Sequence, residues 1–173
     1  AYTLLLTKCL SHLEARGWDQ GSWVQVIDEP DWMNKETLSN ILILMRFYKK
    51  VSPKIKLFQT RFPVGSWSGT GCAPQAVLDS SDYADPVTPE MQPLLKLVDW
   101  WCPHVCQWQS NPSVRQKIIS VASERPRTLI TIYDNGVPII FLSSLRARLQ
   151  AWQVWNTPLN GTLSWYSVNS WAG

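Results

Sequence analysis

Two adjacent carboxylates, Asp28 and Glu29, are the residues of this 173-residue chain best suited to chemistry. They end the apolar run 23–27, and the Pro30 that follows cannot donate to a sheet ladder, so it ends the predicted strand. Where a strand breaks, neighbouring side chains no longer point to opposite faces, and both carboxylates can turn to one side. Such a pair suits glycoside hydrolysis, in which one carboxyl group is held protonated as the acid. A plainer interpretation, a helix-capping acid beside a surface acid, fits the same residues because a predicted helix follows.

Tryptophan is the second unusual feature, because the chain contains 11 of them. Flat aromatic rings stack on the apolar C–H faces of sugars, and the indole N–H can donate to a hydroxyl. Trp23 and Trp152 lie within predicted elements and are expected in the core. The others of interest lie at or just after predicted strand ends: Trp100, Trp101, Trp108, Trp165 and Trp171. Their position favours a carbohydrate pocket over core filling.

The segment Cys102-Pro103-His104-Val105-Cys106 resembles a metal site only superficially. It offers three ligands, whereas a structural zinc site needs four, so we expect no metal here and instead a disulfide or two buried thiols. His104 is a candidate substrate contact, since it follows a predicted strand. No glycine-rich phosphate loop follows any predicted strand, which argues against a cofactor. A serine hydrolase is also disfavoured, because Trp67 rather than serine is central in the 65–69 run.

Composition narrows the possible partners. The net charge of +3 is small, and no basic cluster is longer than Lys49-Lys50, so we expect no nucleic-acid partner. No segment reaches the ~20 apolar residues of a membrane span, and no signal peptide is visible. With 45% apolar and 17% charged residues, the chain is expected to fold as one domain over residues 1–173.

Hydrophobic periodicity predicts the elements that position these side chains. Helices are expected at 2–15, 34–50, 111–124 and 141–155, with Gly17, Asn34 and Asn111 as caps and Pro112 in the first turn of the third. Strands are expected near 23–28, 55–60, 97–101, 129–133 and 162–166, and a long loop at 61–88. This alternation favours an α/β fold with five parallel strands and helical crossovers.

Polar and aromatic residues gather where the predicted strands end: Asp28-Glu29, Thr60, Asp99-Trp100-Trp101, Tyr133-Asp134 and Trp165-Tyr166. The carboxyl ends of the strands are where a (β/α)8 (TIM) barrel has its active site. Five strands are too few for a closed barrel of eight. The sequence therefore predicts the second half of a TIM barrel, about strands four to eight, with the first half supplied upstream or by another chain.

Four ordered segments resemble one family. They are Val26-Ile27-Asp28-Glu29-Pro30, Val98-Asp99-Trp100-Trp101-Cys102-Pro103, Trp152-Gln153-Val154-Trp155 and the closing run 160–171. Together they are similar to segments of glycoside hydrolase family 123 and its wider relatives of unknown function. The resemblance covers nearly the whole chain in the same order. It implies a (β/α)8 catalytic barrel, usually preceded by a β-sandwich, that removes β-linked N-acetylgalactosamine with retention, and an extracellular or periplasmic location.

The resemblance also implies roles for the carboxylates. In substrate-assisted catalysis the acetamido oxygen of the substrate attacks the anomeric carbon, so carboxyl separation does not predict the stereochemistry. Glu29 would be general acid and then base, and Asp28 would hold the acetamido N–H. An apolar aromatic surround raises the pKa of a carboxyl group, so Glu29 is expected protonated and Asp28 ionised. The expected substrate contacts are Trp100, Trp101, His104, Tyr133, Trp165, Tyr166 and Asn169.

A second hypothesis comes from another class of protein, a non-catalytic carbohydrate-binding or architectural module within a larger extracellular assembly. The intact pair Asp28-Glu29 favours the enzyme. Departures from the family's pocket strands, at Ser164 before Trp165 and at Thr131-Ile132 before Tyr133, favour the module. A glycan array combined with a chromogenic hexosaminide assay separates the two.

Overall fold

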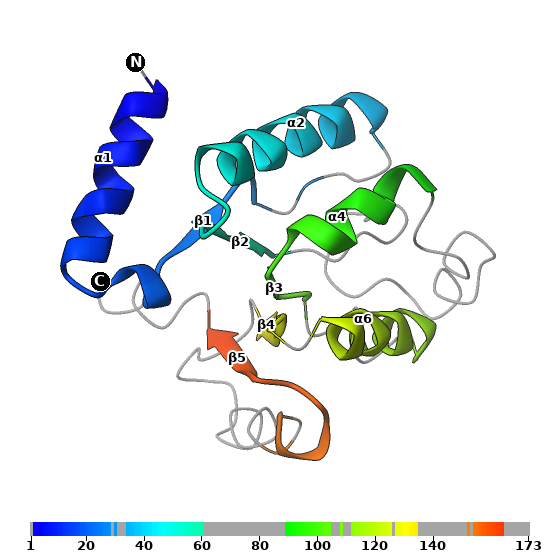
Figure 1. Cartoon of the computed structure of the whole chain (residues 1–173). Helices are drawn as coiled ribbons and strands as arrows, with labels where there is room; N and C mark the ends of the chain where they lie inside the picture. Colours follow the sequence, from blue (N-terminus) through cyan, green and yellow to red (C-terminus); the bar gives the residue numbers. More distant parts are fainter. Residues whose placement is uncertain are drawn as a thin grey trace, which may run out of the picture.

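Helices alternate with parallel strands along the chain (Figure 1). The computed structural model describes residues 2–28, 30, 34–60, 89–104, 108, 112–125, 127–134, 152 and 154–164. The elements are α1 (Tyr2–Ala15), η1 (Asp19–Gly21), β1 (Trp23–Gln25), α2 (Lys35–Val51), β2 (Lys56–Gln59), η3 (Pro89–Met91), α4 (Gln92–Leu97), β3 (Trp100–Trp101), α6 (Pro112–Glu124), β4 (Leu129–Asp134) and β5 (Gly161–Ser164).

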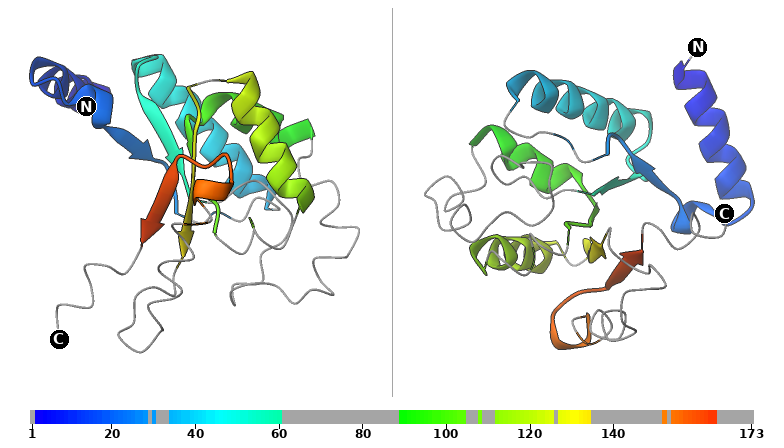
Figure 2. Two further views of the ribbon diagram at one scale, coloured as in Figure 1. Left: turned by 90° about the horizontal axis from the view of Figure 1, so that it is seen from below. Right: turned by 180° about the vertical axis from the view of Figure 1, so that it is seen from behind.

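The strands pair in chain order, β1-β2-β3-β4-β5, and each pair is parallel. Trp23 lies opposite Lys56, Phe58 opposite Trp100, and Trp101 opposite Ile130. Because the strands run the same way, their carboxyl ends share one edge of the sheet, as Figure 2 shows for β4 and β5. The prediction of an α/β chain with parallel strands is confirmed, and helices α2, α4 and α6 lie in the connections from β1 to β4.

Helices α2, α4 and α6 lie along one face of the sheet (Figures 1 and 2). The core between these layers includes Met45, Leu57, Leu94, Trp101 and Ile132, all fully buried. Successive side chains of a strand point to opposite faces, so alternate residues turn away from the helices. These form a second cluster of Phe58, Cys102 and Tyr133, against which Trp23 and Trp100 pack.

Helix α2 forms where its sequence pattern predicts. The Asn34 side chain accepts a hydrogen bond of 3.0 Å from the backbone N–H of Thr37, so it is the expected N-cap. The apolar residues recur at three- and four-residue spacing, which places them on one buried face: Leu38, Ile41, Leu42 and Met45. Lys49 and Lys50 in the last turn offset the partial negative charge of the helix end.

Helix α1 packs more loosely, because none of its residues is fully buried. Leu6 and Leu10 contact the edge of the core, and the Tyr2 hydroxyl lies 2.8 Å from that of Tyr48 on α2. Gly17 follows the helix with φ of 69°, a left-handed conformation that glycine adopts without steric cost. The predicted helix 2–15 and its glycine cap are both confirmed.

The prediction near β3 was wrong in part. Residues up to Leu97 form α4, and only Trp100–Trp101 is strand, so Asp99 lies at the amino end of the sheet rather than its carboxyl end. A short apolar run cannot be assigned to strand or helix by periodicity alone. Here Leu94 and Leu95 of α4, and Val98, which follows the helix in an extended conformation, are buried against the core.

Trp152 was also predicted wrongly, since its side chain is 64% exposed rather than part of the core. The loop 61–88, the Asn111 cap, most of the predicted helix 141–155 and the end of the last strand lie outside the described residues. The first helical position of Pro112 is confirmed. In the described part of the chain, no helix has the length and apolar character needed to cross a membrane.

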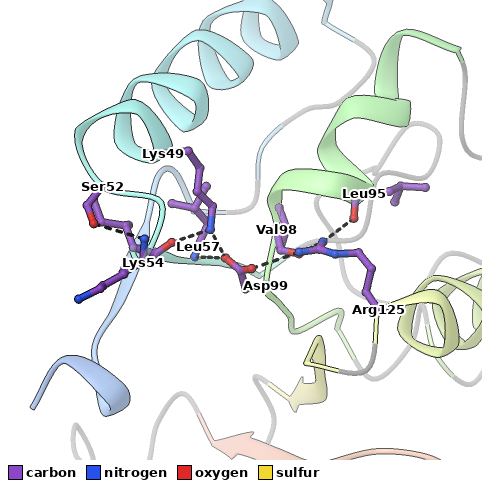
Figure 3. A network of polar contacts seen from close by, with 9 residues as sticks. Lys49, Ser52, Lys54, Leu57, Leu95, Val98, Asp99 and Arg125 are labelled. Atoms are coloured by element: carbon purple, nitrogen blue, oxygen red, sulfur yellow. Dashed lines mark hydrogen bonds and ion pairs between the residues drawn. The ribbon is translucent and has the colours of Figure 1, made fainter.

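The carboxylate of Asp99, just before β3, accepts hydrogen bonds from three other places in the chain (Figure 3). Its Oδ2 accepts hydrogen bonds from Lys49 Nζ at 2.7 Å and from the backbone N–H of Leu57 at 2.9 Å. Its Oδ1 accepts one from the Arg125 guanidinium at 3.2 Å. Arg125 also donates to the carbonyls of Leu95 and Val98, at the end of α4. A single side chain before β3 therefore ties α2, β2 and the end of α6 together.

Replacing Asp99 should destabilise the fold. In Asp99→Ala the charges of Lys49 and Arg125 and the N–H of Leu57 lose an acceptor in a partly buried place, so we expect a loss of about 2 to 3 kcal/mol in the free energy of unfolding, measured by urea denaturation. Glu14→Gln is the matched control, because it breaks a surface ion pair with Lys54 whose side chain is 72% exposed. Equal urea midpoints for the two variants would contradict the proposed contribution of Asp99 to stability.

Candidate functional site

Asp28 lies just beyond the carboxyl end of β1 and is exposed. Its Oδ1 accepts hydrogen bonds from Thr60 Oγ1 at 2.8 Å and from Gln25 Nε2 at 3.0 Å. Gln25 Nε2 is also 3.4 Å from Thr60 Oγ1, so the three side chains form one cluster. Oδ2 of Asp28 has no hydrogen-bond partner among the described residues.

The register of β1 against β2 assembles this cluster. Gln25 lies opposite Phe58, so the residues just past the two strands, Asp28 and Thr60, come together at the same edge. The buried Gln59 donates from Nε2 to the carbonyl of Ile27 at 2.9 Å, which fixes the backbone directly before Asp28. Its Oε1 has no hydrogen-bond partner within the described part of the chain.

Trp100 lies on the sheet face away from the helices. Its ring is 5.0 Å from that of Trp23 and 4.4 Å from that of Phe58, measured between centroids. The indole N–H donates to Thr131 Oγ1 at 2.8 Å. It is therefore already bonded within the protein, whereas the sequence predicted that it would donate to a sugar hydroxyl. What remains for a ligand is the partly exposed ring itself.

Trp101 has the opposite placement. It is fully buried in the core between the sheet and its helices, one residue out of phase with Trp100. Trp108 is buried in the same core. We therefore leave Trp101, one of the expected substrate contacts, out of the site proposed below.

His104 and Tyr133 meet at the carboxyl edge of the sheet. They form a parallel bridge beyond β3, and their rings are 5.0 Å apart and nearly perpendicular. Both side chains are buried. Among the described residues, Asp28 bonds to Gln25 and Thr60 rather than to any aromatic side chain, so this pair is not part of the carboxylate cluster.

Four expected site residues, Glu29, Trp165, Tyr166 and Asn169, lie outside the described residues. The proximity of Glu29 to Asp28 and the approach of the last strand's aromatics therefore stay predictions. Gln25, Gln59 and Thr60 were not predicted as site residues. Their only sequence signal is polarity at or near the ends of two strands that pair.

Cys102 is a free, fully buried thiol in the aromatic cluster, so the alternative of a disulfide does not apply to it. Burial raises the pKa of the Cys102 thiol to about 12, against a smaller lowering by a hydrogen bond with Thr131. The thiol therefore stays neutral at physiological pH and is a poor nucleophile and metal ligand. Where the structure describes the chain, no three side chains of His, Cys, Asp or Glu gather as a metal site.

Cys9 and Cys102, the two cysteines that the structure describes, should differ in reactivity. At pH 8 iodoacetamide should alkylate the exposed Cys9 in the native protein and leave Cys102 unmodified, because the reagent attacks the thiolate. Peptide mass spectrometry after timed quenching measures both, and labelling in urea is the control in which both react. Equal native rates at the two positions would contradict the burial of Cys102.

A scan of protein-family models finds no match to this chain, and a search of curated proteins finds none either. The resemblance to glycoside hydrolase family 123 thus stays a prediction from the sequence segments that suggested it.

Proposed function

We propose that this chain is part of a retaining glycoside hydrolase that acts on a 2-acetamido sugar, β-N-acetylgalactosaminidase-like, by substrate-assisted catalysis. The observation that carries the proposal is the state of the Asp28 carboxylate. Two donors, Thr60 and Gln25, occupy Oδ1, while Oδ2 faces no described donor. An ionised carboxylate held in this way can accept the N–H of an acetamido group and orient it.

In the proposed reaction the acetamido oxygen attacks the anomeric carbon, and the bond to the leaving group breaks. Glu29 gives its proton to the departing oxygen, and the product is an oxazolinium ion. The charge of Asp28 stabilises this ion through the acetamido nitrogen. Glu29 then takes a proton from water, which attacks the anomeric carbon, opens the oxazolinium ring and restores the carboxyl acid.

The fold supports the same proposal at a coarser level. Sequential parallel strands, with helices on one face, are what half of a (β/α)8 barrel consists of, and Asp28 lies at the edge where such barrels have their sites. We propose that the remaining strands come from an upstream segment or another chain. Carbohydrate as substrate and an extracellular or periplasmic location belong to the same proposal and rest on the family resemblance.

Variants of the two carboxylates test the chemistry in the complete protein with both barrel halves present. Glu29→Gln should abolish hydrolysis of 2-acetamido glycosides with poor leaving groups and spare activated aryl glycosides, which need no proton. Asp28→Asn should slow the hydrolysis of both kinds of substrate by about a hundredfold or more, because the oxazolinium ring must close in both before the leaving group departs. Wild-type rates in both variants on a natural 2-acetamido glycan would overturn the proposed pair. Glycan binding without any cleavage by the unmodified protein would favour the non-catalytic module.

Thr60 is a positioning residue in this proposal, and its hydroxyl can be tested separately. Thr60→Val keeps the shape but removes the donor to Asp28, so kcat on aryl 2-acetamido glycosides should fall about tenfold or more, with KM little changed. Thr60→Ser retains the hydroxyl and should recover most of the rate. Thr7→Val, on the exposed face of α1, is the matched control. A serine variant as slow as the valine variant would mean that Thr60 acts through packing alone.

A further inference from the structure

A cavity of about 740 Å³ lies at the opposite end of the strands from Asp28. Trp23, Lys56 and Leu129, the first residues of β1, β2 and β4, line it from the sheet. The rest of its wall comes from η1, from the end of α2 and from the residues that lead into β2, β3 and β4. Because all of these lie on the amino face, the cavity is separate from the carboxylate cluster at the carboxyl edge.

The cavity has an excess of positive charge. Four cationic side chains line it, Lys49, Lys54, Lys56 and Arg127, against the two carboxylates of Asp19 and Asp99. The Asp99 carboxylate is already saturated, since it accepts from Lys49, Arg125 and the N–H of Leu57. Asp19 accepts from the neutral amide of Gln20 at 3.0 Å.

Two of these cations have no carboxylate partner within the part of the chain that the structure describes. Lys56 Nζ donates to the carbonyl of Gln20 and lies 5.0 Å from the centroid of the Trp23 ring, so neutral groups hold it in place without cancelling its charge. Arg127 is exposed and makes no hydrogen bond or ion pair with any described residue. A guanidinium is a preferred partner of tetrahedral oxyanions, because its planar fork donates two parallel hydrogen bonds.

We infer that this cavity binds an oxyanion, a phosphate or sulfate group carried on a small polar molecule, with Arg127 and Lys56 as its main contacts. The volume is several times what an inorganic ion needs and lies in the range of small-molecule sites. Trp23 and Leu129 supply the apolar part of the wall against which the rest of the ligand packs. The inference concerns the amino face and does not depend on the proposed hydrolase.

Titration calorimetry of the full protein tests it with inorganic phosphate, inorganic sulfate, phenyl phosphate and phenyl sulfate. Sodium chloride holds the ionic strength constant, because screening by salt alone changes the strength of interactions between exposed charges. We expect saturable binding of one ester at least tenfold tighter than its inorganic ion, and the phosphate and sulfate arms show which group the site prefers. Arg127→Ser should weaken that binding about tenfold, and Lys56→Gln should also weaken it.

Arg46→Ser is the control, because Arg46 is an exposed arginine of α2 outside the cavity lining, and it should leave binding unchanged. Circular dichroism checks that each variant is folded; Arg127, which bonds to no described residue, is expected to tolerate replacement. The inference is overturned if no ester binds above the chloride background. It is equally overturned if Arg127→Ser and Lys56→Gln bind as the unmodified protein does.

Discussion

The ion-paired carboxylate of Asp99 is the interaction on which the arrangement of this fold most depends. It lies between the end of α4 and the start of β3, and its two oxygens receive donors from α2, from β2 and from the residue that follows α6. Packing alone does not fix how far one parallel strand slides along its neighbour, because apolar contacts are not directional. The hydrogen bond from the Leu57 backbone N–H to Asp99 is directional, and together with the backbone bonds from Asp99 to Leu57 and from Cys102 to Gln59 it holds β2 against β3 at one height.

The register of β1 against β2 acts at the other end of the sheet. It brings Thr60 beside Asp28, where the hydroxyl of Thr60 donates to one oxygen of the carboxylate. The two ends of the strands therefore have different roles. Ion pairs at the amino end stabilise the layers, and the exposed carboxylate at the carboxyl end is available for a ligand.

Much of the fold could be predicted from local pattern, and the site only in part. The cap and the buried stripe of α2, and the glycine after α1, follow from side-chain chemistry that acts within a few residues. Leu97 was assigned to a strand although it ends α4, because a short apolar run fits a strand or a buried turn of helix equally well. The contrast between Trp100 and Trp101 depends on which of two neighbours faces the helices, and nothing in their own identity decides it.

The carboxylate cluster also could be predicted only in part from local sequence pattern. Asp28 is visible as a carboxylate at the end of an apolar run, whereas Gln25 and Thr60 become partners only through pairing between strands. Pairing partners are separated by the whole of α2, so no window of sequence contains both. Polarity at strand ends is a usable signal, but it marked Asp99 as well, which lies at the opposite edge.

The order of the strands bears on how the chain reaches its structure. Each strand pairs with the one made before it, so every new pairing closes a loop of a few dozen residues and none requires the two ends of the chain to meet. Short loops cost less entropy to close than long ones, whereas parallel pairing across a helical crossover is slower than pairing in a hairpin. The sheet can therefore grow one βα step at a time as the polypeptide emerges from the ribosome.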